Sequence, residues 1–551
     1  MEEVTEKRKE SIKSWLKDRN NLAFLGILAL AVIIRLYYFS ITKSQPLWWD
    51  EADYLAYAKN LAGLGVSWIV TQQHNSLFTY IVAGFFKIGF GEATIKLLLE
   101  VVPSIASVVL VYLICKEMYK DKRIGLVASF LLAVFWDYLF NTTRFHVDVP
   151  ALFFGLLTIY VFWKGYENKE RIFGKINPWW AIPLAVIFAV VTYSIRRGYF
   201  LFGGFILIYM LSTKNWKELA KEKYNWIGAV MGVALFFIVE RTIFYSEIAG
   251  VAGKYYHEEL PINLIDPLGV FKASLSFGTI FSSILFYIFL IGLAVLILEL
   301  ALSFGHIRND KEKKADLFHL ITIAVTLALF IFILRTEGTF GEVRWYYPLM
   351  LGAFVCVSRG GIFISQFFKK YSKNISAIIL ILLIGIGGYY QLKTADSVIK
   401  DKVETYEGMR EAGLLLKEIS GEEDKIITLG QPQVEYYSER GTIHAREWVD
   451  ADSASPEHLA KTLEKIKETP NAKYLVISFS EPGYPDWMKR IGTVNMNGQI
   501  LIATWEIPFM ETKIDLINNK QDIKAGGTIE GVTFTLVDIK RDVFIYKIDT
   551  A

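Results

Sequence analysis

The side chains best placed for chemistry are three carboxylates, Asp50, Glu51 and Asp53, which follow the apolar segment Leu22–Ile41. That segment has about 20 residues, which is enough to cross a bilayer. Carboxylates are costly to bury in lipid, so we expect the cluster at the membrane surface. A carboxylate held there can act as a general base where a lipid-borne substrate meets a water-borne one. The alternative is a solvated loop whose acids cap a helix at Asp53–Leu61.

A second set of polar side chains, Arg144, His146 and Asp148, falls in a short turn between two apolar segments. Charged side chains at the end of a membrane helix often do no more than extend toward water. The functional interpretation is that Asp148 supports the first acidic cluster or binds sugar hydroxyls. Arg35, inside the first apolar segment, is expected to extend to the outer surface.

Arginines on the outer side of the membrane are a third signal, because basic residues normally concentrate on the cytoplasmic side. Arg196 and Arg197 form one such pair, and Arg344 lies in a later loop with Glu342 and Tyr347. A guanidinium stays charged, and its planar fork matches phosphate oxygens. Acids and arginines on one membrane face would suit the transfer of a group from a lipid phosphate.

Histidines give a weak indication of a metal site. His74, His257 and Glu258 are candidate ligands, but the chain has seven His and no HxxxH-type spacing on an evident helix. No cofactor is expected, and a bound divalent metal is the less favoured alternative.

The composition is that of a multi-pass membrane protein. Of 551 residues, 53% are hydrophobic, which is unusual for a soluble chain. The net charge of +3 and the lack of a basic run give no sign of a nucleic-acid partner. Cys115 and Cys356 both lie in apolar runs, which argues against a disulfide framework. The abundance of Ile, Lys and Glu favours a thermophilic prokaryote, with an archaeon among the candidates.

About eleven apolar segments have the length of a membrane span. They are residues 22–41, 97–115, 124–140, 147–163, 178–195, 198–212, 226–244, 277–303, 317–334, 348–367 and 375–392. Leu77–Phe90 is apolar but too short to span, and is expected to lie in the interface. With this count every Lys/Arg-rich loop falls on the side of the basic N-terminal tail, which is therefore interpreted as a retained cytoplasmic end. The loops with the acids and the outer arginines share the opposite face.

From about residue 393 the pattern changes to that of a soluble α/β domain. The strand-like runs are Lys425–Leu429, Tyr474–Phe479, Ile500–Ile507, Val532–Val537 and Val543–Ile548, and the helical runs are Glu407–Ile419 and Pro456–Glu468. The expected organisation is a cytoplasmic tail at 1–20, a transmembrane module at 21–392 and an extracytoplasmic α/β domain at 393–551.

Four motifs together resemble the membrane glycosyltransferases of the GT-C fold. Within that group the chain is most similar to the dolichyl-phosphate-mannose protein mannosyltransferases and the bacterial lipid A aminoarabinose transferases. The motifs are Trp49-Asp50-Glu51-Ala52-Asp53-Tyr54, the segment Leu77–Gly91, Arg144-Phe145-His146-Val147-Asp148-Val149-Pro150 and Arg344-Trp345-Tyr346-Tyr347-Pro348. One departure is His74-Asn75-Ser76-Leu77, where the family often has His/Lys-Pro-Pro-Leu.

The resemblance implies an inverting transfer of a sugar from a polyprenyl-phosphate donor to a hydroxyl of a protein, glycan or lipid acceptor at the outer membrane face. It gives the catalytic acidic position to Asp50, with Glu51 beside it, the second acidic position to Asp148 and a phosphate contact to Arg344. The other candidate substrate-binding residues are Asp53, Tyr54, His74, Arg144, His146, Arg196, Arg197, Glu342 and Tyr347.

Two other functions stay open. An oligosaccharyltransferase of the same fold typically carries Trp-Trp-Asp-Tyr-Gly in its tail, whereas this chain has Trp448-Val449-Asp450. A lipid flippase or solute transporter would favour broken helices near the bilayer midplane and two related halves. Pro103 and Pro183 do interrupt two segments, but the charges gather at the outer surface and no paired halves are evident.

Overall fold

The computed structural model of this chain describes residues 17–64, 75–244, 280–332, 342–444, 463–478, 493–496, 499–502, 526–529 and 531–550. The chain divides into two compact units. The membrane unit comprises Met1–Lys43, Ser76–Phe78 and Glu92–Lys400, and the C-terminal unit comprises Ser44–Asn75, Thr79–Gly91 and Asp401–Ala551. This division differs from the expected boundaries, because the acidic stretch groups with the C-terminal residues.

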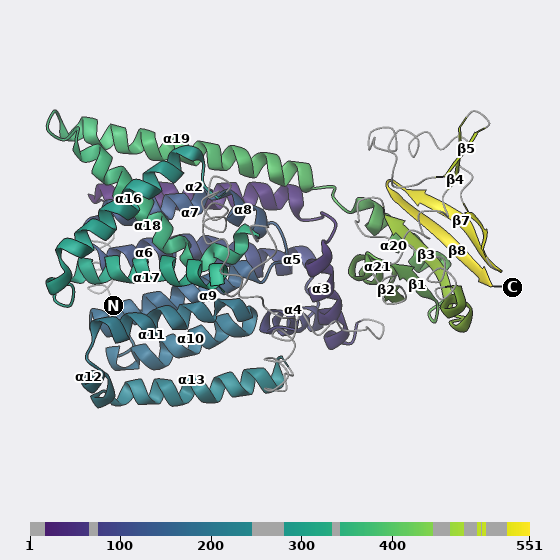
Figure 1. Cartoon of the computed structure of the whole chain (residues 1–551), viewed down its shortest axis with the longest axis horizontal. Coiled ribbons are helices and arrows are strands. Elements are labelled where there is room, and N and C mark those ends of the chain that lie inside the picture. The colour runs from purple at the N-terminus through teal and green to yellow at the C-terminus, as the bar shows by residue number, and fades with distance from the viewer. Residues whose placement is uncertain are drawn as a thin grey trace, which may run out of the picture. The chain divides into compact units, whose positions relative to one another are not determined.

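The membrane unit is built from long apolar helices that lie alongside one another (Figure 1). The helices of this unit, among which α5, α8 and α12 are short, are α2 (Arg19–Thr42), α5 (Glu92–Lys96), α6 (Val102–Met118), α7 (Lys122–Val134), α8 (Trp136–Thr142), α9 (Asp148–Val161), α10 (Ala181–Ile195), α11 (Leu201–Thr213), α12 (Trp216–Lys221), α13 (Lys223–Thr242), α16 (Ser283–Leu302), α17 (Lys311–Phe332), α18 (Tyr347–Gln366) and α19 (Lys373–Lys402). Among the described residues, 8 helices are long and apolar enough to cross a membrane, or 9 if the bent pair α7 and α8 is one span. The other two expected segments fall on α11 and α17, and the short segment at 77–90 forms α4 (Leu77–Lys87). The expected multi-pass helical class is confirmed.

The break between α7 and α8 is stabilised from inside the bundle. The two helices meet at an angle of 53°, and a break of this kind leaves carbonyl groups without their helical donors. Arg35 of α2 donates to the carbonyl oxygens of Ala133 at 3.0 Å and Leu132 at 3.3 Å. Its Nε donates to Ser104 Oγ at 2.7 Å, and the residue is 1% exposed. The expectation that Arg35 extends to the surface is therefore wrong.

Helices α16 and α18 approach each other at two glycines. A Cβ atom on Gly292 would overlap the carbonyl oxygen of Cys356, and one on Gly360 would overlap the carbonyl oxygen of Ile288. Small residues allow such close backbone contact between membrane helices, where van der Waals packing drives association. This contact fixes α18, whose first residues carry part of the candidate site.

The C-terminal unit is an α/β sheet domain, as expected. Its six-stranded sheet has the order β2-β1-β3-β8-β7-β6. The strands are β1 (Lys425–Thr428), β2 (Gly441–His444), β3 (Ala472–Ser478), β6 (Gly526–Ile529), β7 (Val532–Lys540) and β8 (Val543–Thr550), and β4 (Thr493–Met496) pairs with β5 (Gln499–Ile502) separately. Strand β1 is parallel to β2 and β3, and the remaining neighbours are antiparallel.

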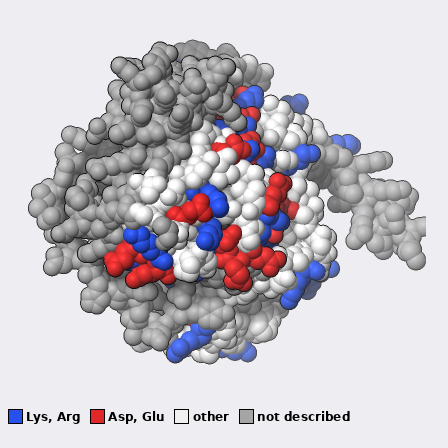
Figure 2. Space-filling view, turned by 90° about the vertical axis from the view of Figure 1, so that its right-hand side faces the viewer, with Lys and Arg blue, Asp and Glu red and all other residues white. Residues whose placement is uncertain are grey.

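Both faces of this sheet are covered. In β3, Leu475 and Ile477 enter one core while Tyr474 and Val476 enter the other, because successive strand residues point to opposite faces. The apolar side of helix α20 (Glu407–Ile419), which includes Met409, packs into the second core. Acidic and basic side chains intermix over the described surface in Figure 2, which shows no large area of a single sign there.

The predicted strand runs correspond to strands of the structure, but several short elements were not predicted. The predicted runs that begin at Lys425, Tyr474, Val532 and Val543 correspond to β1, β3, β7 and β8. The run at Ile500–Ile507 overlaps β5 within the described residues, and residues 463–468 of the expected helix Pro456–Glu468 are helical. Strands β2, β4 and β6 and helix α21 (Gln431–Ser438) were missed, because these short segments contain too few apolar residues to show a hydrophobic pattern.

Candidate functional site

A buried carboxylate, Asp148, organises the candidate site of the membrane unit. It lies in the first turn of α9, where the positive end of the helix dipole favours a negative charge. Its Oδ2 accepts a hydrogen bond from Arg196 Nη1 at 2.7 Å, and its Oδ1 is 3.0 Å from the Tyr199 hydroxyl. Asp148 is 0% exposed. A carboxylate so deeply buried needs cationic partners, and the fold supplies them.

A second arginine joins the same carboxylate from a distant part of the chain. Arg344 precedes α18, and its Nη1 lies 3.7 Å from Asp148 Oδ2. Arg344 also pairs with Glu342. The Tyr199 hydroxyl is 3.0 Å from the Arg344 carbonyl oxygen as well as from Asp148, so its single proton can serve either acceptor. The start of α9, the residues that follow α10 and the residues that precede α18 thus meet around one negative charge.

His146 is a further contact of Arg344. Its Nδ1 contacts Arg344 Nη1, and because a guanidinium only donates, Nδ1 must be the acceptor and the ring proton sits on Nε2. Burial, and then the neighbouring positive charges of Arg344 and Arg144, lower the pKa of His146 well below its ordinary value. The imidazole is therefore neutral at physiological pH and orients the guanidinium without repelling it.

The simple alternative for this turn, in which its charged side chains extend into water, does not fit the structure. Arg144 is 1% exposed and its guanidinium lies 5.4 Å from the centre of the Phe140 ring. His146 and Asp148 are also buried. All three side chains are therefore held inside the unit rather than extended from it.

Tyr347 has a supporting position behind this cluster. Its hydroxyl donates to Asp137 Oδ2 at 2.8 Å, and Asn141 Nδ2 donates to the same oxygen at 3.1 Å. Tyr347 is buried, and these contacts fix the start of α18 against α8. A direct substrate contact, expected from the sequence, remains a prediction for Tyr347.

The adjacent arginines Arg196 and Arg197 have different partners. Arg197 Nη2 lies 3.6 Å from Glu240 Oε2 on α13, and its guanidinium lies 3.9 Å from the centre of the Phe244 ring. Tyr193 also donates to Glu240. Arg196 is thus part of the Asp148 cluster, whereas the described contacts of Arg197 are with α13 and the residues that follow it.

The acidic stretch lies in the C-terminal unit, on α3 (Trp49–Ala62). This helix begins before the expected start at Asp53, so Asp50 and Glu51 occupy its first turn. Glu51 is fully buried, and its Oε2 accepts from the Trp48 backbone N–H at 2.8 Å, as in a capping box. The capping interpretation therefore applies to Glu51, while Asp50 beside it is partly exposed. Asp53 is partly exposed and Tyr54 is buried.

Contacts with α21 and the residues around it hold α3 within the C-terminal unit. The Leu47 N–H donates to the Tyr437 hydroxyl at 2.9 Å, and Lys59 Nζ lies 3.9 Å from the centre of the Tyr436 ring. Arg410 Nη1 donates to the Ser44 carbonyl oxygen at 2.8 Å. The stretch that carries Asp50 is thus packed as part of a folded domain and is not a free loop.

The sequence interpretation missed two contributors to these clusters. Tyr199, three residues after Arg196, bridges Asp148 and the Arg344 backbone. Asp137 lies within an apolar run, and an acid in such a run is a sign of function or of a buried polar network that could have identified it.

The metal candidates His74, His257 and Glu258 lie outside the described residues. Within the described ranges, no group of three or more His, Cys, Asp or Glu side chains could hold a metal ion.

Comparison with known proteins identifies the fold. The family model described as dolichyl-phosphate-mannose-protein mannosyltransferase matches residues 73–239. An uncharacterized protein of Aquifex aeolicus is 24% identical over 444 residues, which is 71% of this chain and 82% of that protein.

Solved structures with a similar fold include ArnT and AglB. ArnT from Cupriavidus metallidurans bound to undecaprenyl phosphate has a TM-score of 0.56 at 10% identity, over 95% of this chain and 97% of ArnT. The oligosaccharyltransferase AglB from Archaeoglobus fulgidus, in complex with an inhibitory peptide and a dolichol-phosphate, has a TM-score of 0.56 at 13% identity, over 88% of this chain and 75% of AglB. The chain therefore has the GT-C glycosyltransferase fold, which confirms the resemblance found from the motifs.

Proposed function

From the GT-C fold and the Asp148 cluster, we propose that this membrane protein is an inverting glycosyltransferase with a polyprenyl-phosphate sugar donor. The observation that carries the proposal is the pair Arg196 and Arg344, drawn from distant segments and oriented by one buried carboxylate, Asp148. A solved structure with the same fold, ArnT, is bound to undecaprenyl phosphate. A guanidinium carries five N–H donors in a planar fork, so it can bond a carboxylate and still present donors to phosphate oxygens.

The chemistry assigned to this cluster is stabilisation of the leaving phosphate. When the bond between the anomeric carbon and the phosphate oxygen breaks, negative charge grows on that oxygen. Cationic donors that are already oriented stabilise this charge without reorganisation. Arg344 is held by Asp148, His146 and Glu342, so its guanidinium is fixed before a donor binds.

Asp50 is the residue we propose as general base. It would take the proton of the acceptor hydroxyl as that oxygen attacks the anomeric carbon. A single displacement inverts the anomeric configuration, whereas retention would call for a second carboxylate acting as nucleophile. Glu51, through its bond to the Trp48 N–H, would position the helix turn that carries Asp50. Mannose, the sugar of the family model's name, is one donor to test. The site would face the extracytoplasmic side, as the positive-inside rule indicates.

The decisive experiment measures polyprenyl-phosphate binding and sugar transfer by the purified full-length protein. Arg344→Gln is expected to weaken polyprenyl-phosphate affinity about 10- to 100-fold, because a hydrogen bond to a charged group contributes about 1.5–3 kcal/mol. The matched control is Arg123→Gln, which changes a half-buried arginine paired with Asp121 at the start of α7 and should bind within about twofold of wild type. Equal affinity in both variants would contradict the phosphate clamp.

The base is tested separately. Asp50→Asn should lose turnover on a panel of polyprenyl-phosphate sugars while keeping donor affinity. Full turnover in Asp50→Asn would remove this residue from its role, and a product with retained anomeric configuration would refute inversion.

An oligosaccharyltransferase is the second candidate, because AglB matches with an equal TM-score. The ArnT type is favoured because that match extends over nearly the whole length of both chains, whereas AglB is longer than the matched region. Transfer of a whole oligosaccharide to an asparagine-containing peptide would favour the AglB type. Solute uptake into sealed vesicles without covalent transfer would favour a transporter.

A further inference from the structure

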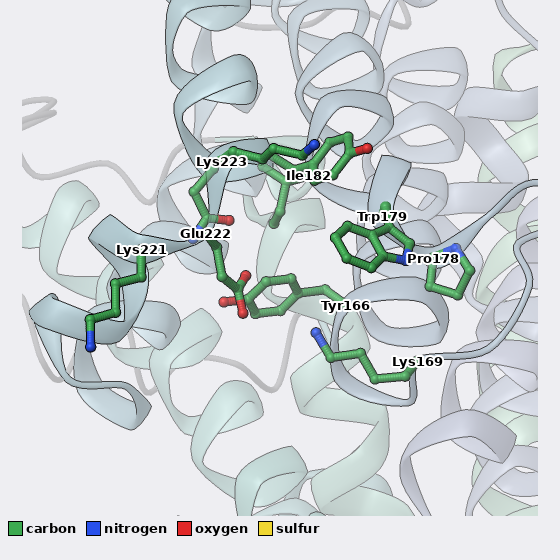
Figure 3. A pocket seen from close by; sticks show the side chains of 10 residues that line it. Tyr166, Lys169, Pro178, Trp179, Ile182, Lys221, Glu222 and Lys223 are labelled. Carbon is green, nitrogen blue, oxygen red and sulfur yellow. The ribbon is translucent and has the colours of Figure 1, made fainter.

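A pocket of about 550 Å³ lies in the membrane unit, apart from the Asp148 cluster. It is formed by the turn that precedes α10 and by the junction of α12 and α13. Its lining includes Tyr166, Lys169, Trp179, Glu222, Lys223 and Tyr224. Figure 3 shows the labelled side chains of this lining, with the Glu222 carboxylate beside the Tyr166 hydroxyl and Lys221 directed away from the rings.

Lysines and aromatic rings alternate around the pocket. The Trp179 and Tyr224 ring centres are 5.4 Å apart in an edge-to-face arrangement. Lys223 Nζ lies 5.2 Å from the centre of the Tyr224 ring, and Lys169 Nζ lies 4.6 Å from the centre of the Tyr166 ring. Because the lysines already cover these aromatic faces, the pocket is unsuited to a quaternary ammonium group, which would need the same faces.

The charge around the pocket favours an anion. Lys169 and Lys223 line it against the single Glu222, and the third lysine of the lining, Lys221, is directed away. Helix α13 begins at Lys223, and α10 follows the turn Pro178–Trp180, so the positive ends of two helix dipoles face this region. Within the described residues, the side chain of Glu222 makes no capping hydrogen bond to the first turn of α13. The Asn225 N–H of that turn donates to the Glu222 carbonyl oxygen at 3.0 Å, so the donors that the turn can add for an anion are the preceding N–H groups of Lys223 and Tyr224.

The position along the chain indicates a lipid rather than a soluble anion. Around the pocket the large rings of Trp180, Trp216 and Trp226 are exposed. Trp226 Nε1 donates to the Ala220 carbonyl oxygen at 2.8 Å, which holds α12 against the start of α13. Exposed tryptophans that flank membrane helices mark the headgroup level of a bilayer. The positive-inside rule assigns this end of α10 and α13 to the cytoplasmic leaflet, which carries anionic lipids.

We propose that this pocket binds the phosphate headgroup of an anionic phospholipid such as phosphatidylglycerol, with Lys169 and Lys223 as its cationic contacts and Trp179 against the glycerol and upper acyl region. The site does not depend on the proposed transferase reaction, and it would hold this part of the membrane unit at a fixed depth in the bilayer.

The test is native mass spectrometry of the full-length protein released from nanodiscs that contain equal amounts of phosphatidylglycerol and phosphatidylcholine. Wild type should retain phosphatidylglycerol preferentially. In the double variant Lys169→Gln/Lys223→Gln the ratio of bound phosphatidylglycerol to phosphatidylcholine should fall about 10- to 30-fold, since each lysine near an anionic surface contributes about fivefold in binding. The matched control is Lys369→Gln/Lys373→Gln, which removes two charges from another basic loop assigned to the same face and should keep the wild-type preference.

Two further measurements make the result decisive. In the first, inorganic phosphate or glycerol 3-phosphate is added to the protein in phosphatidylcholine nanodiscs and the Tm is measured. A rise in Tm equal to that given by phosphatidylglycerol would show that the pocket takes a soluble anion instead of a lipid. Trp179→Ala, which keeps the lysines, should shorten lipid retention without abolishing the preference for phosphatidylglycerol. The same lipid preference in wild type and in Lys169→Gln/Lys223→Gln would overturn the proposal.

Discussion

The pair Asp148–Arg196 allows the electrostatic argument to be tested by a double-mutant cycle. Asp148→Asn keeps the shape of the side chain and an oxygen for the Tyr199 hydroxyl, but removes the charge that Arg196 meets at 2.7 Å and Arg344 at 3.7 Å. Arg196→Gln removes the cation and leaves the buried carboxylate with the more distant Arg344. In each single variant one partially desolvated charge loses its closest partner.

The expected magnitude follows from burial. Breaking a buried ion pair by removing one partner costs about 3–5 kcal/mol, but the Arg196 side chain is 21% exposed, so water recovers part of the loss. We expect each single variant to lose about 3 kcal/mol of unfolding free energy. The unfolding entropy is about 2 cal/mol/K per residue, so over several hundred residues this corresponds to a fall in Tm of about 4 °C. The double variant should lose less than the sum, with a coupling energy of about 2 kcal/mol.

Tryptophan fluorescence during heating of the purified protein measures this cycle. The control cycle is Asp148→Asn with Arg197→Gln, in which the neighbouring arginine pairs with Glu240 rather than Asp148. That second cycle should be additive within about 0.5 kcal/mol. Additivity in the Asp148–Arg196 cycle as well would mean that the carboxylate does not orient the arginine, which would contradict the proposed phosphate clamp.

Two more predictions concern stability. The pKa of His146 in the folded state is well below its ordinary value of 6.5, so below pH 6.5 the unfolded state takes up a proton that the folded state does not. The unfolding free energy should therefore fall by about 1.4 kcal/mol at pH 5.5. Thermal melting between pH 7.5 and 5.5 should show a smaller loss of stability in His146→Gln, and the same pH dependence in this variant as in wild type would show that His146 is protonated in the folded state. Gly292→Ala should lower the unfolding free energy by about 3 kcal/mol, because the new methyl group meets the backbone of α18 rather than a movable side chain. The control is Gly385→Ala, at a helical position with open space around it, which should be neutral or slightly stabilising in the same melting experiment. Equal effects of the two changes would rule out a close α16–α18 contact.

The architecture could be predicted from the chain because it depends on averages over many residues. A run of about 20 apolar residues must form a helix in lipid, since each backbone polar group needs an internal partner there. The expected spans therefore fall on helices, and β1, β3, β7 and β8 of the C-terminal unit follow from short runs rich in β-branched and aromatic residues. Charge on alternate loops placed Arg196, Asp148 and Arg344 on one face, and the structure brings them into contact.

The partner of each charge could not be predicted, because it depends on contacts between residues far apart in the chain. Arg196 and Arg197 are neighbours with the same chemistry, yet only packing decides that the first meets Asp148 and the second Glu240. The same is true of Arg35, which satisfies the broken α7–α8 helix because α2 packs beside that break. The sequence was enough to predict a multi-pass membrane protein and to expect Asp148, Arg196 and Arg344 on one membrane face. Tertiary structure alone decided which of these charges are buried together, because the free energy of a buried charge is set by its immediate neighbours and not by its place in the chain.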